Sequence, residues 1–189
     1  MGQAFSLPDV AVTTFEIFRN CGKGCYTAFV LLSVTPQSWM AQAIQLAIDN
    51  VRNGKGGPFG ALVVRDGELL STGVNLVTST NDPTAHAEMV AIRAACKKLG
   101  AFQLTGCDVY TSCEPCPMCL GALYWARPKQ FYYACDQEAA ARAGFDDAFI
   151  YNELLLAAEL RTIPGHRLSA ELASKPFEEW LKSANRIRY

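Results

Sequence analysis

Apolar residues in the first half of the chain recur with a helical period that begins close to Ser38. The apolar positions are separated by three or four residues, which is the spacing of one helix face. They are Met40, Ala43, Ile44, Ala47, Ile48 and Val51. Ser38 has a side chain suited to an N-cap, and Gly54 is a suitable stop signal. The pattern therefore predicts a helix that starts at Ser38 and ends near Gly54.

Beyond this helix, strands are predicted to alternate with helices. Asp66-Gly67 separates two short apolar runs, 61–65 and 69–73, and therefore predicts a β-hairpin. The further predicted elements are a helix over 85–99, a strand over 107–111, a helix over 116–125, a strand over 131–134, a helix over 148–160, a strand over 161–168 and a helix over 170–186. Such alternation implies a layered α/β fold with helices on both faces of a sheet.

Residues 1–37 follow neither a clean helical period nor a clean alternation. Gly22, Gly24 and Pro36 interrupt them. We interpret 1–37 as an N-terminal extension, either an appended arm or a stretch with poor intrinsic order. A chain of 189 residues has one compact domain by default, so we expect a single domain over 38–189.

Composition and charge narrow the range of partners. Half of the residues are hydrophobic and 19% are charged, which is typical of a globular protein. Lys plus Arg number 17, against 18 for Asp plus Glu. The chain therefore has no excess of positive charge with which to bind along a phosphate backbone. No stretch approaches the ~18 apolar residues that cross a bilayer. We therefore expect neither a nucleic acid nor a membrane as partner.

The eight cysteines bear on both redox state and metal binding. They lie at positions 21, 25, 96, 107, 113, 116, 119 and 135. An even number would suit a disulfide framework, but a chain this apolar does not need cross-links and has no clean secretory signal. Cys113, Cys116 and Cys119 cluster, with a proline on either side of Cys116. The cluster favours a metal site, and we expect a reducing, cytoplasmic location.

Two short motifs carry the candidate chemistry. His86 and Glu88 form H-x-E, and Pro115, Cys116 and Cys119 form P-C-x-x-C, with Cys116 thirty positions after His86. A lone C-x-x-C could be a redox pair or half of a structural zinc site, and a lone H-x-E could be two surface residues. Together, each at the predicted start of a helix, they match the signature of zinc-dependent nucleobase deaminases.

The residue types suit that chemistry. Helix N-termini lower the pKa of a thiol and so favour the thiolates that zinc requires. One His and two Cys make three ligands, whereas a structural zinc has four, and the other histidine, His166, lies in a distant segment. The fourth position is then open to water, and Glu88 is the candidate for moving its protons. Cys113 is an alternative ligand or a packing residue, and Glu114 is a second acid or a helix cap.

The chain resembles the bacterial guanine deaminases of the cytidine-deaminase superfamily over about 38–189. The shared runs are GGPFGA at 56–61, NDPTAHAE at 81–88, YTSCEPCPMCLGA at 110–122, YWARP at 124–128 and AGFDD at 143–147. The GFDD run and the C-terminal Tyr189 are the features that point to guanine. The resemblance implies a cytidine-deaminase-like three-layer α/β/α sandwich with a mixed central sheet. It also implies one Zn²⁺ per subunit and the conversion of guanine to xanthine and ammonia in purine catabolism.

The same resemblance implies a substrate pocket. Asn75 should hydrogen-bond to the purine edge, because a carboxamide both donates and accepts. Phe59 and Trp125 should wall the pocket and stack on the base. Asp147 should accept hydrogen bonds from guanine N–H groups. In the family the C-terminal segment is swapped across a homodimer, and Tyr189 would close the partner's site.

Other functions stay open at this point. The nearest is deamination of another base or nucleoside: guanosine, cytosine, or adenosine in tRNA. A tRNA deaminase would need a basic face, which the near-neutral charge balance argues against, whereas spacing alone leaves a nucleoside possible. A non-catalytic zinc module is a different class, and Glu88 together with the missing fourth ligand argues against it. A nucleic-acid-binding protein is a third class, and its binding would weaken with salt.

Overall fold

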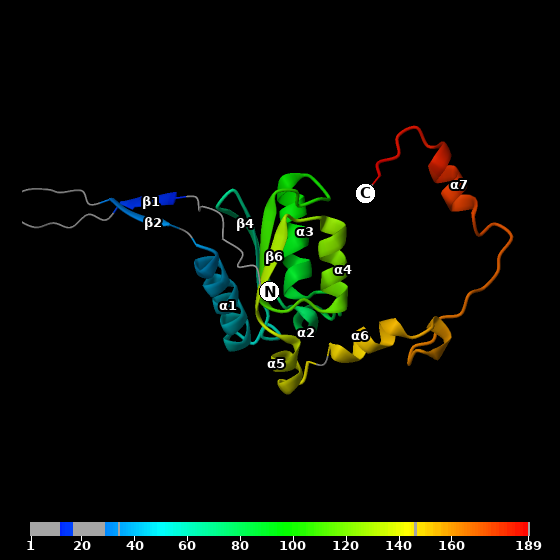
Figure 1. Cartoon of the computed structure of the whole chain (residues 1–189), viewed down its shortest axis with the longest axis horizontal. Helices are drawn as coiled ribbons and strands as arrows, with labels where there is room; N and C mark the ends of the chain where they lie inside the picture. Colours follow the sequence, from blue (N-terminus) through cyan, green and yellow to red (C-terminus); the bar gives the residue numbers. More distant parts are fainter. Residues whose placement is uncertain (1–11, 17–28, 34, 146, 189) are drawn as a thin grey trace, which may run out of the picture. The chain divides into compact units, whose positions relative to one another are not determined.

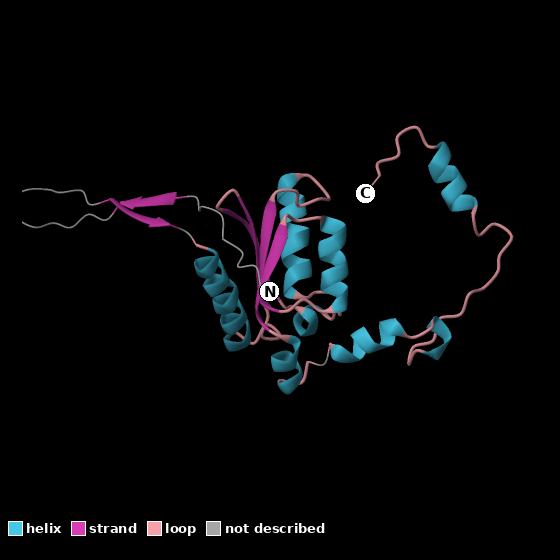
Figure 2. Cartoon of the chain, in the orientation of Figure 1, coloured by secondary structure: helices cyan, strands magenta, loops and turns pink. Residues whose placement is uncertain are grey.

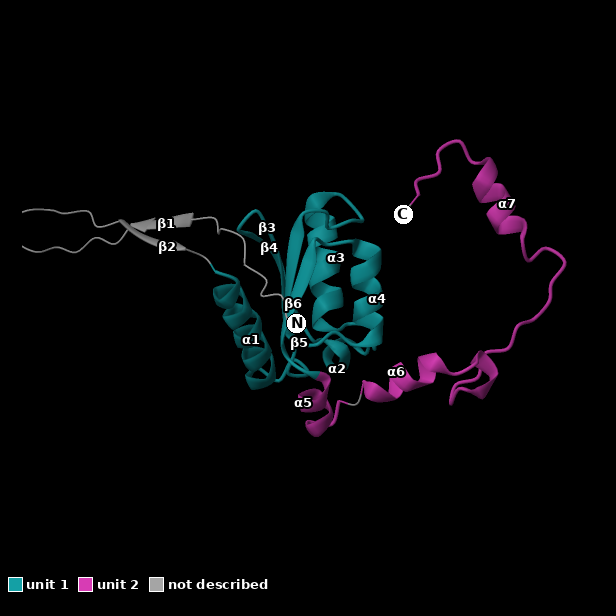
Figure 3. Ribbon diagram, viewed as in Figure 1, with its two compact units in different colours: residues 1–136 teal, residues 137–189 magenta. Residues whose placement is uncertain are grey.

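The computed structural model describes residues 12–16, 29–33, 35–145 and 147–188. The chain forms two compact units, residues 1–136 and residues 137–189 (Figure 3). The predicted boundary after residue 37 falls beside a stretch that lies largely outside the described residues, so the interpretation of 1–37 stays a prediction.

The first unit is built on a four-stranded mixed sheet. Its strands are β3 (Gly60–Arg65), β4 (Glu68–Val74), β5 (Cys107–Cys113) and β6 (Gln130–Cys135). Their order is β4-β3-β5-β6, with β3 antiparallel to both of its neighbours and β5 parallel to β6. The predicted hairpin is confirmed: Asp66 and Gly67 have φ of 51° and 76°, and positive φ at both central residues is what a tight type I′ turn requires.

Helices cover both faces of this sheet (Figures 1 and 2). The helix α1 (Pro36–Arg52) packs on the face that carries Leu62, Val64 and Tyr110. The helices α3 (Ala87–Leu99) and α4 (Pro117–Ala126) pack on the opposite face, with a short α2 (Val77–Thr80) between β4 and α3. The three-layer α/β/α sandwich with a mixed central sheet is therefore confirmed.

The start of α1 differs from the predicted one. The N-cap is Thr35, and Ser38 lies in the first turn. The Thr35 hydroxyl accepts from Ser38 N at 3.2 Å, and the Ser38 hydroxyl accepts from Thr35 N at 3.0 Å. This reciprocal pair satisfies two backbone donors, and Pro36 suits the first helical position because its missing N–H would have no partner there. The prediction of Ser38 as N-cap is therefore wrong.

Only some of the apolar residues of α1 lie on its buried face. Its buried residues are Trp39, Ala43, Ala47 and Asn50. The larger Ile44, Ile48 and Val51 lie to one side and are 39%, 39% and 51% exposed. The two alanines let the helix approach the sheet closely, so the bulkier apolar side chains are left at the rim. A polar residue, Asn50, occupies a buried position near the end of the helix.

The second unit is mostly helical. It contains α5 (Gln137–Arg142), α6 (Ala148–Leu155), a 3₁₀ turn η1 (Ala158–Leu160) and α7 (Lys175–Lys182). The predicted helix over 148–160 is therefore divided into α6 and η1. The predicted helix over 170–186 is shorter than expected, because Pro176 has no backbone N–H and is accommodated only in a first turn.

The predicted strand over 161–168 is wrong, since the structure has no strand there. Thr162 N donates to the Glu153 carboxylate at 2.6 Å, and Arg161 Nε donates to Glu153 O at 3.1 Å. These bonds turn the chain back toward α6. Pro164 cannot donate to a ladder, which further disfavours a strand.

Within the N-terminal segment, β1 (Val12–Glu16) and β2 (Phe29–Ser33) form an antiparallel pair. The sequence pattern did not predict these two strands. None of the helices in the described part of the chain is long and apolar enough to span a bilayer.

A close approach between β4 and α3 fixes where α3 begins. A Cβ added at Gly73 would lie 2.1 Å from Ala87 O and 2.5 Å from Ala91 N. We expect Gly73→Ala to lower the free energy of unfolding, measured in urea, by at least about 2 kcal/mol, because backbone rather than a flexible side chain would have to move.

Gly121→Ala is the matched control for this prediction. Gly121 lies inside α4, and a Cβ there meets nothing within 4 Å. Alanine should stabilise this helix by up to about 1 kcal/mol through its higher helix propensity. Equal effects of the two substitutions would contradict the role given to Gly73.

Candidate metal centre and catalytic site

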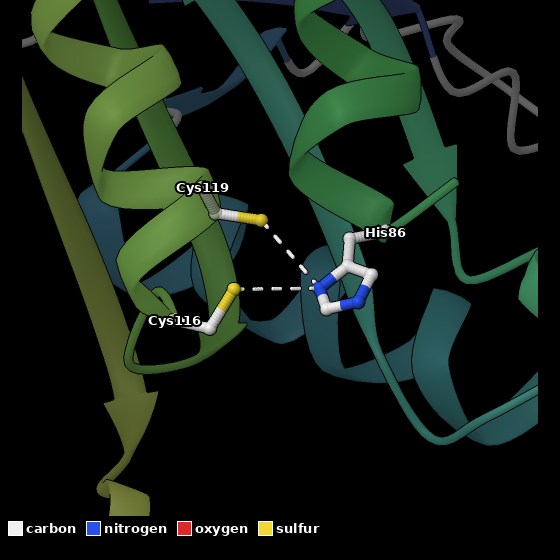
Figure 4. A group of neighbouring side chains, drawn as sticks. All are labelled: His86, Cys116 and Cys119. Atoms are coloured by element: carbon white, nitrogen blue, oxygen red, sulfur yellow. Dashed lines mark hydrogen bonds between the residues drawn. The ribbon is translucent and has the colours of Figure 1, made fainter. Parts of the chain in front are cut away.

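The two sequence motifs lie at the N-termini of two helices on the same face of the sheet (Figure 4). His86 is the N-cap residue of α3, and Cys116 is the N-cap residue of α4. The carbonyl groups of His86 and Cys116 accept the first helical hydrogen bonds, from Val90 N at 3.0 Å and from Leu120 N at 2.8 Å. The predicted placement of both motifs at helix starts is correct.

Three side chains converge at this point. The Sγ atoms of Cys116 and Cys119 each lie 3.6 Å from His86 Nδ1 (Figure 4). All three donor atoms lie within 4.8 Å of one another. A metal about 2.1 Å from a nitrogen and about 2.3 Å from a sulfur, at a tetrahedral angle, separates those donors by about 3.6 Å. The arrangement of His86, Cys116 and Cys119 therefore fits zinc.

Electrostatics favours a thiolate at Cys116, whereas the hydrogen bond with Cys116 and burial raise the pKa of the Cys119 thiol. The N-terminal end of a helix carries unpaired N–H groups and a partial positive charge. The pKa of Cys116 is lowered to about 4, because the Cys119 thiol donates to it and the His86 ring lies beside it. Cys113, the alternative ligand, instead directs its thiol to Asp136 O at 3.5 Å.

Glu88 lies in the first turn of α3, buried beside the three donors. Its carboxylate accepts from Cys119 Sγ at 3.5 Å and from Thr111 Oγ1 at 3.2 Å. Burial raises the pKa of Glu88 above its ordinary value. The spacing of two in H-x-E did not show that both side chains face one site, and the structure shows Glu88 against a cysteine of the cluster.

Thr111 is a residue that the sequence reasoning missed. It lies on β5, is almost completely buried, and contacts Glu88 from the facing sheet. Its hydroxyl also lies 3.0 Å from Cys113 O. The available signal was a polar side chain inside an otherwise buried strand, at a position two residues from Val109 and so on the same face of the sheet.

The residues predicted to bind the base lie in different parts of the chain. Asn75 is buried and follows β4, and its backbone N donates to Phe59 O at 3.1 Å. Leu76 N donates to Ala85 O at 2.9 Å, which fastens the Asn75 loop beside the start of α3. Asn75 and Phe59 thus extend the β3–β4 pairing at the edge where the metal ligands lie.

Trp125, Asp147 and Tyr189 are not brought to this edge by the first unit. Trp125 lies nine residues after Cys116, near the other end of α4, and its side chain is 63% exposed. Nine helical residues correspond to about 13 Å along the axis. Asp147 belongs to the second unit, directly before α6. Tyr189 lies outside the described residues.

Comparison with known proteins identifies relatives along most of the chain. Residues 33–135 match the cytidine and deoxycytidylate deaminase zinc-binding region. The guanine deaminase of Bacillus subtilis is 54% identical over 153 residues, which are 81% of this chain and 98% of that protein. The X-ray structure of guanine deaminase from Bacillus subtilis superimposes with a TM-score of 0.81 at 52% identity, covering 82% of this chain and 99% of that one.

A more distant relative matches a shorter stretch. The tRNA-specific adenosine deaminase of Aquifex aeolicus is 45% identical over 82 residues, or 43% of this chain and 54% of that protein. This similarity leaves more than half of this chain unmatched. The chain belongs to the zinc-binding cytidine and deoxycytidylate deaminase family and, within it, to the guanine deaminases.

Proposed function

We propose that this protein hydrolyses guanine to xanthine and ammonia in purine catabolism, with zinc held by His86, Cys116 and Cys119 and with Glu88 as the proton carrier. The observation that carries the proposal is the buried Glu88 carboxylate, 3.5 Å from Cys119 Sγ in the ligand cluster. A structural zinc site has no use for such a carboxylate, whereas hydrolysis needs one to move protons. The 54% identity to a guanine deaminase over most of the chain supports guanine as the substrate.

The residues divide the chemistry among them. Zinc bound by one imidazole and two thiolates supplies Lewis-acid activation of water. Glu88 takes a proton from the attacking water and passes protons to the ring nitrogen and to the departing amine. The raised pKa of Glu88 suits this work, because a carboxyl group that must both accept and release protons needs a pKa nearer neutrality. Thr111 holds the carboxylate from the opposite side.

Base recognition is assigned to the other predicted residues. Asn75 and Phe59 lie together at the edge of the sheet that carries the metal ligands, which supports their role in holding the purine. In this proposal Asp147 accepts hydrogen bonds from guanine N–H groups and Tyr189 closes the site, whereas the stacking role expected of Trp125 has no support from its place near the other end of α4. The alignment with the Bacillus guanine deaminase covers 81% of the chain, so it reaches beyond the zinc-binding region. That reach supports a role for the second unit in selecting guanine.

A panel of substrates tests this proposal. We expect ammonia release from guanine at rates well above those for guanosine, cytosine and adenine. Glu88→Gln should abolish guanine turnover while zinc, measured by elemental analysis, stays at one ion per chain. The amide keeps the size of the side chain but cannot carry protons between water and base.

Glu68→Gln provides the control for this experiment. Glu68 is exposed at the start of β4, at the other end of that strand from Asn75. Glu68→Gln should leave guanine turnover and zinc content unchanged. Normal guanine turnover in Glu88→Gln would refute the role of Glu88, and turnover of another base in preference to guanine would refute the substrate.

Asp147 gives a separate prediction about specificity. Asp147→Asn should reduce kcat/KM for guanine by at least about tenfold with zinc retained, because a charged acceptor is worth more than a neutral one. Asp66→Asn makes the same exchange in the exposed hairpin turn and should have no effect. If both variants turn over guanine equally, Asp147 is not in the pocket.

A homodimer is the proposed assembly, and the second unit supports it. Neither α6 nor α7 has a buried residue. On α7 the apolar side chains of Phe177, Trp180 and Leu181 recur at helical spacing and are largely exposed. A helix of eight residues is not stable alone in water, so it needs a surface to pack on. In a homodimer with swapped C-terminal segments, α7 of each protomer would pack on its partner. The swap would also bring Tyr189 to the partner's site.

Light scattering after size exclusion tests the dimer. Trp180→Glu should shift the mass from dimer toward monomer and reduce guanine turnover together, with zinc retained, because a charge on the apolar face of α7 opposes packing. Glu178→Gln, on the same helix, should leave both unchanged. A wild-type monomer with full turnover would rule out the swapped assembly.

A further inference from the structure

Asn50 is a buried polar residue that the chemistry above does not use. It is 3% exposed, in the last turn of α1, on the face that packs against the sheet. Its Nδ2 donates to Gly57 O at 2.9 Å and to Asn75 O at 2.8 Å. Asn50 therefore ties the glycine-rich loop after α1 to the residue that follows β4.

The orientation of the Asn50 amide is forced by its neighbours. Two carbonyl oxygens face its Nδ2, so a reversed amide would place oxygen against oxygen. Its own Oδ1 is then left without a hydrogen-bond partner, and it is the one buried side-chain N or O atom in that condition within the described part of the chain. A buried unpaired acceptor is unfavourable. This cost is offset by the two bonds from Nδ2, whose purpose goes beyond packing because they fix the positions of Gly57 and Asn75.

That purpose is visible in the Asn75 side chain. Asn75 Oδ1 accepts from Gly57 N at 3.4 Å and from Val77 N at 3.3 Å. Gly57 is held close to this amide, since a Cβ added there would lie 3.5 Å from Asn75 Oδ1. With two N–H groups directed at its oxygen, the Asn75 amide cannot reverse. Its NH₂ group makes no hydrogen bond to other described residues and is the end left for a ligand.

We propose that Asn50 is a specificity-determining positioning residue that fixes Asn75 as a hydrogen-bond donor toward the bound purine. The proposal rests on the proposed function, in which Asn75 contacts the base. Asn50 holds Gly57 and Asn75 through their carbonyl groups, Gly57 N then holds Asn75 Oδ1, and Asn75 Nδ2 is presented to the substrate. The group it selects is an acceptor, such as the carbonyl oxygen or the unprotonated imidazole nitrogen of an oxopurine.

A double-mutant cycle tests whether Asn50 acts through Asn75. We expect Asn50→Ala to reduce kcat/KM for guanine by about tenfold, mainly through KM, because one hydrogen bond to the bound base is lost in ground state and transition state alike. Asn75→Ala should reduce it by at least as much. The double variant should match Asn75→Ala alone, since Asn50 has nothing left to position. Zinc content should stay at one ion per chain throughout.

Two further variants make the cycle decisive. Asn53→Ala, an exposed exchange at the end of the same helix, should leave kcat/KM unchanged. Asn50→Ser keeps one donor and serves as the folded variant if Asn50→Ala does not fold; its smaller loss should also vanish in the Asn75→Ala background. The proposal would be overturned if the two losses in kcat/KM multiply in the double variant. An unchanged KM in a folded Asn50 variant would overturn it as well. A wild-type protein that releases no ammonia from guanine would instead refute the proposed function.

Discussion

The site depends on two helices whose N-termini meet on one face of the sheet. Close packing of α3 on β4 at Gly73 sets the position of His86 and Glu88, and the apolar contacts of α4 with the same sheet face set Cys116 and Cys119. The two helix ends place partial positive charge where thiolates must form. Because the ligands belong to the ends of rigid elements, the 3.6 Å distances from His86 Nδ1 to the two sulfurs are set by the fold itself rather than by flexible loops.

This arrangement concentrates polar groups in a buried region, which a stable fold tolerates only when those groups are paired. Glu88 is held by Thr111 and Cys119, so its carboxylate is buried with partners on both oxygens. The cysteines and the histidine face one another around the position that zinc fits. Among the described residues, the buried side-chain atom left without a hydrogen bond is Asn50 Oδ1, whose amide nitrogen donates to Asn75 O.

Local signals account for what the sequence could predict. Helix periodicity, the Asp-Gly turn and the two motifs depend on neighbours in the chain, so the sandwich and the zinc ligands followed from them. Thr35, Asn50 and Thr111 were missed because their roles depend on contacts across a helix start, a loop and a sheet. The strand expected over 161–168 failed for the same reason: apolar alternation cannot show that hydrogen bonds to Glu153 turn the chain away.

In the proposed function, the first unit supplies the chemistry and the two units share the selection of the base. The zinc-binding region that the deaminase family shares spans 33–135 and lies within the first unit. The match to a tRNA-specific enzyme covers less than half of the chain. A hydrolytic centre that serves several bases cannot by itself choose among them, because zinc and Glu88 act on the amine-bearing carbon of any of them. Selection must come from donors and acceptors around the ring. In our proposal, Asn75 supplies donors from the first unit and Asp147 supplies an acceptor from the second. Guanine carries acceptors as well as N–H donors and can therefore engage both.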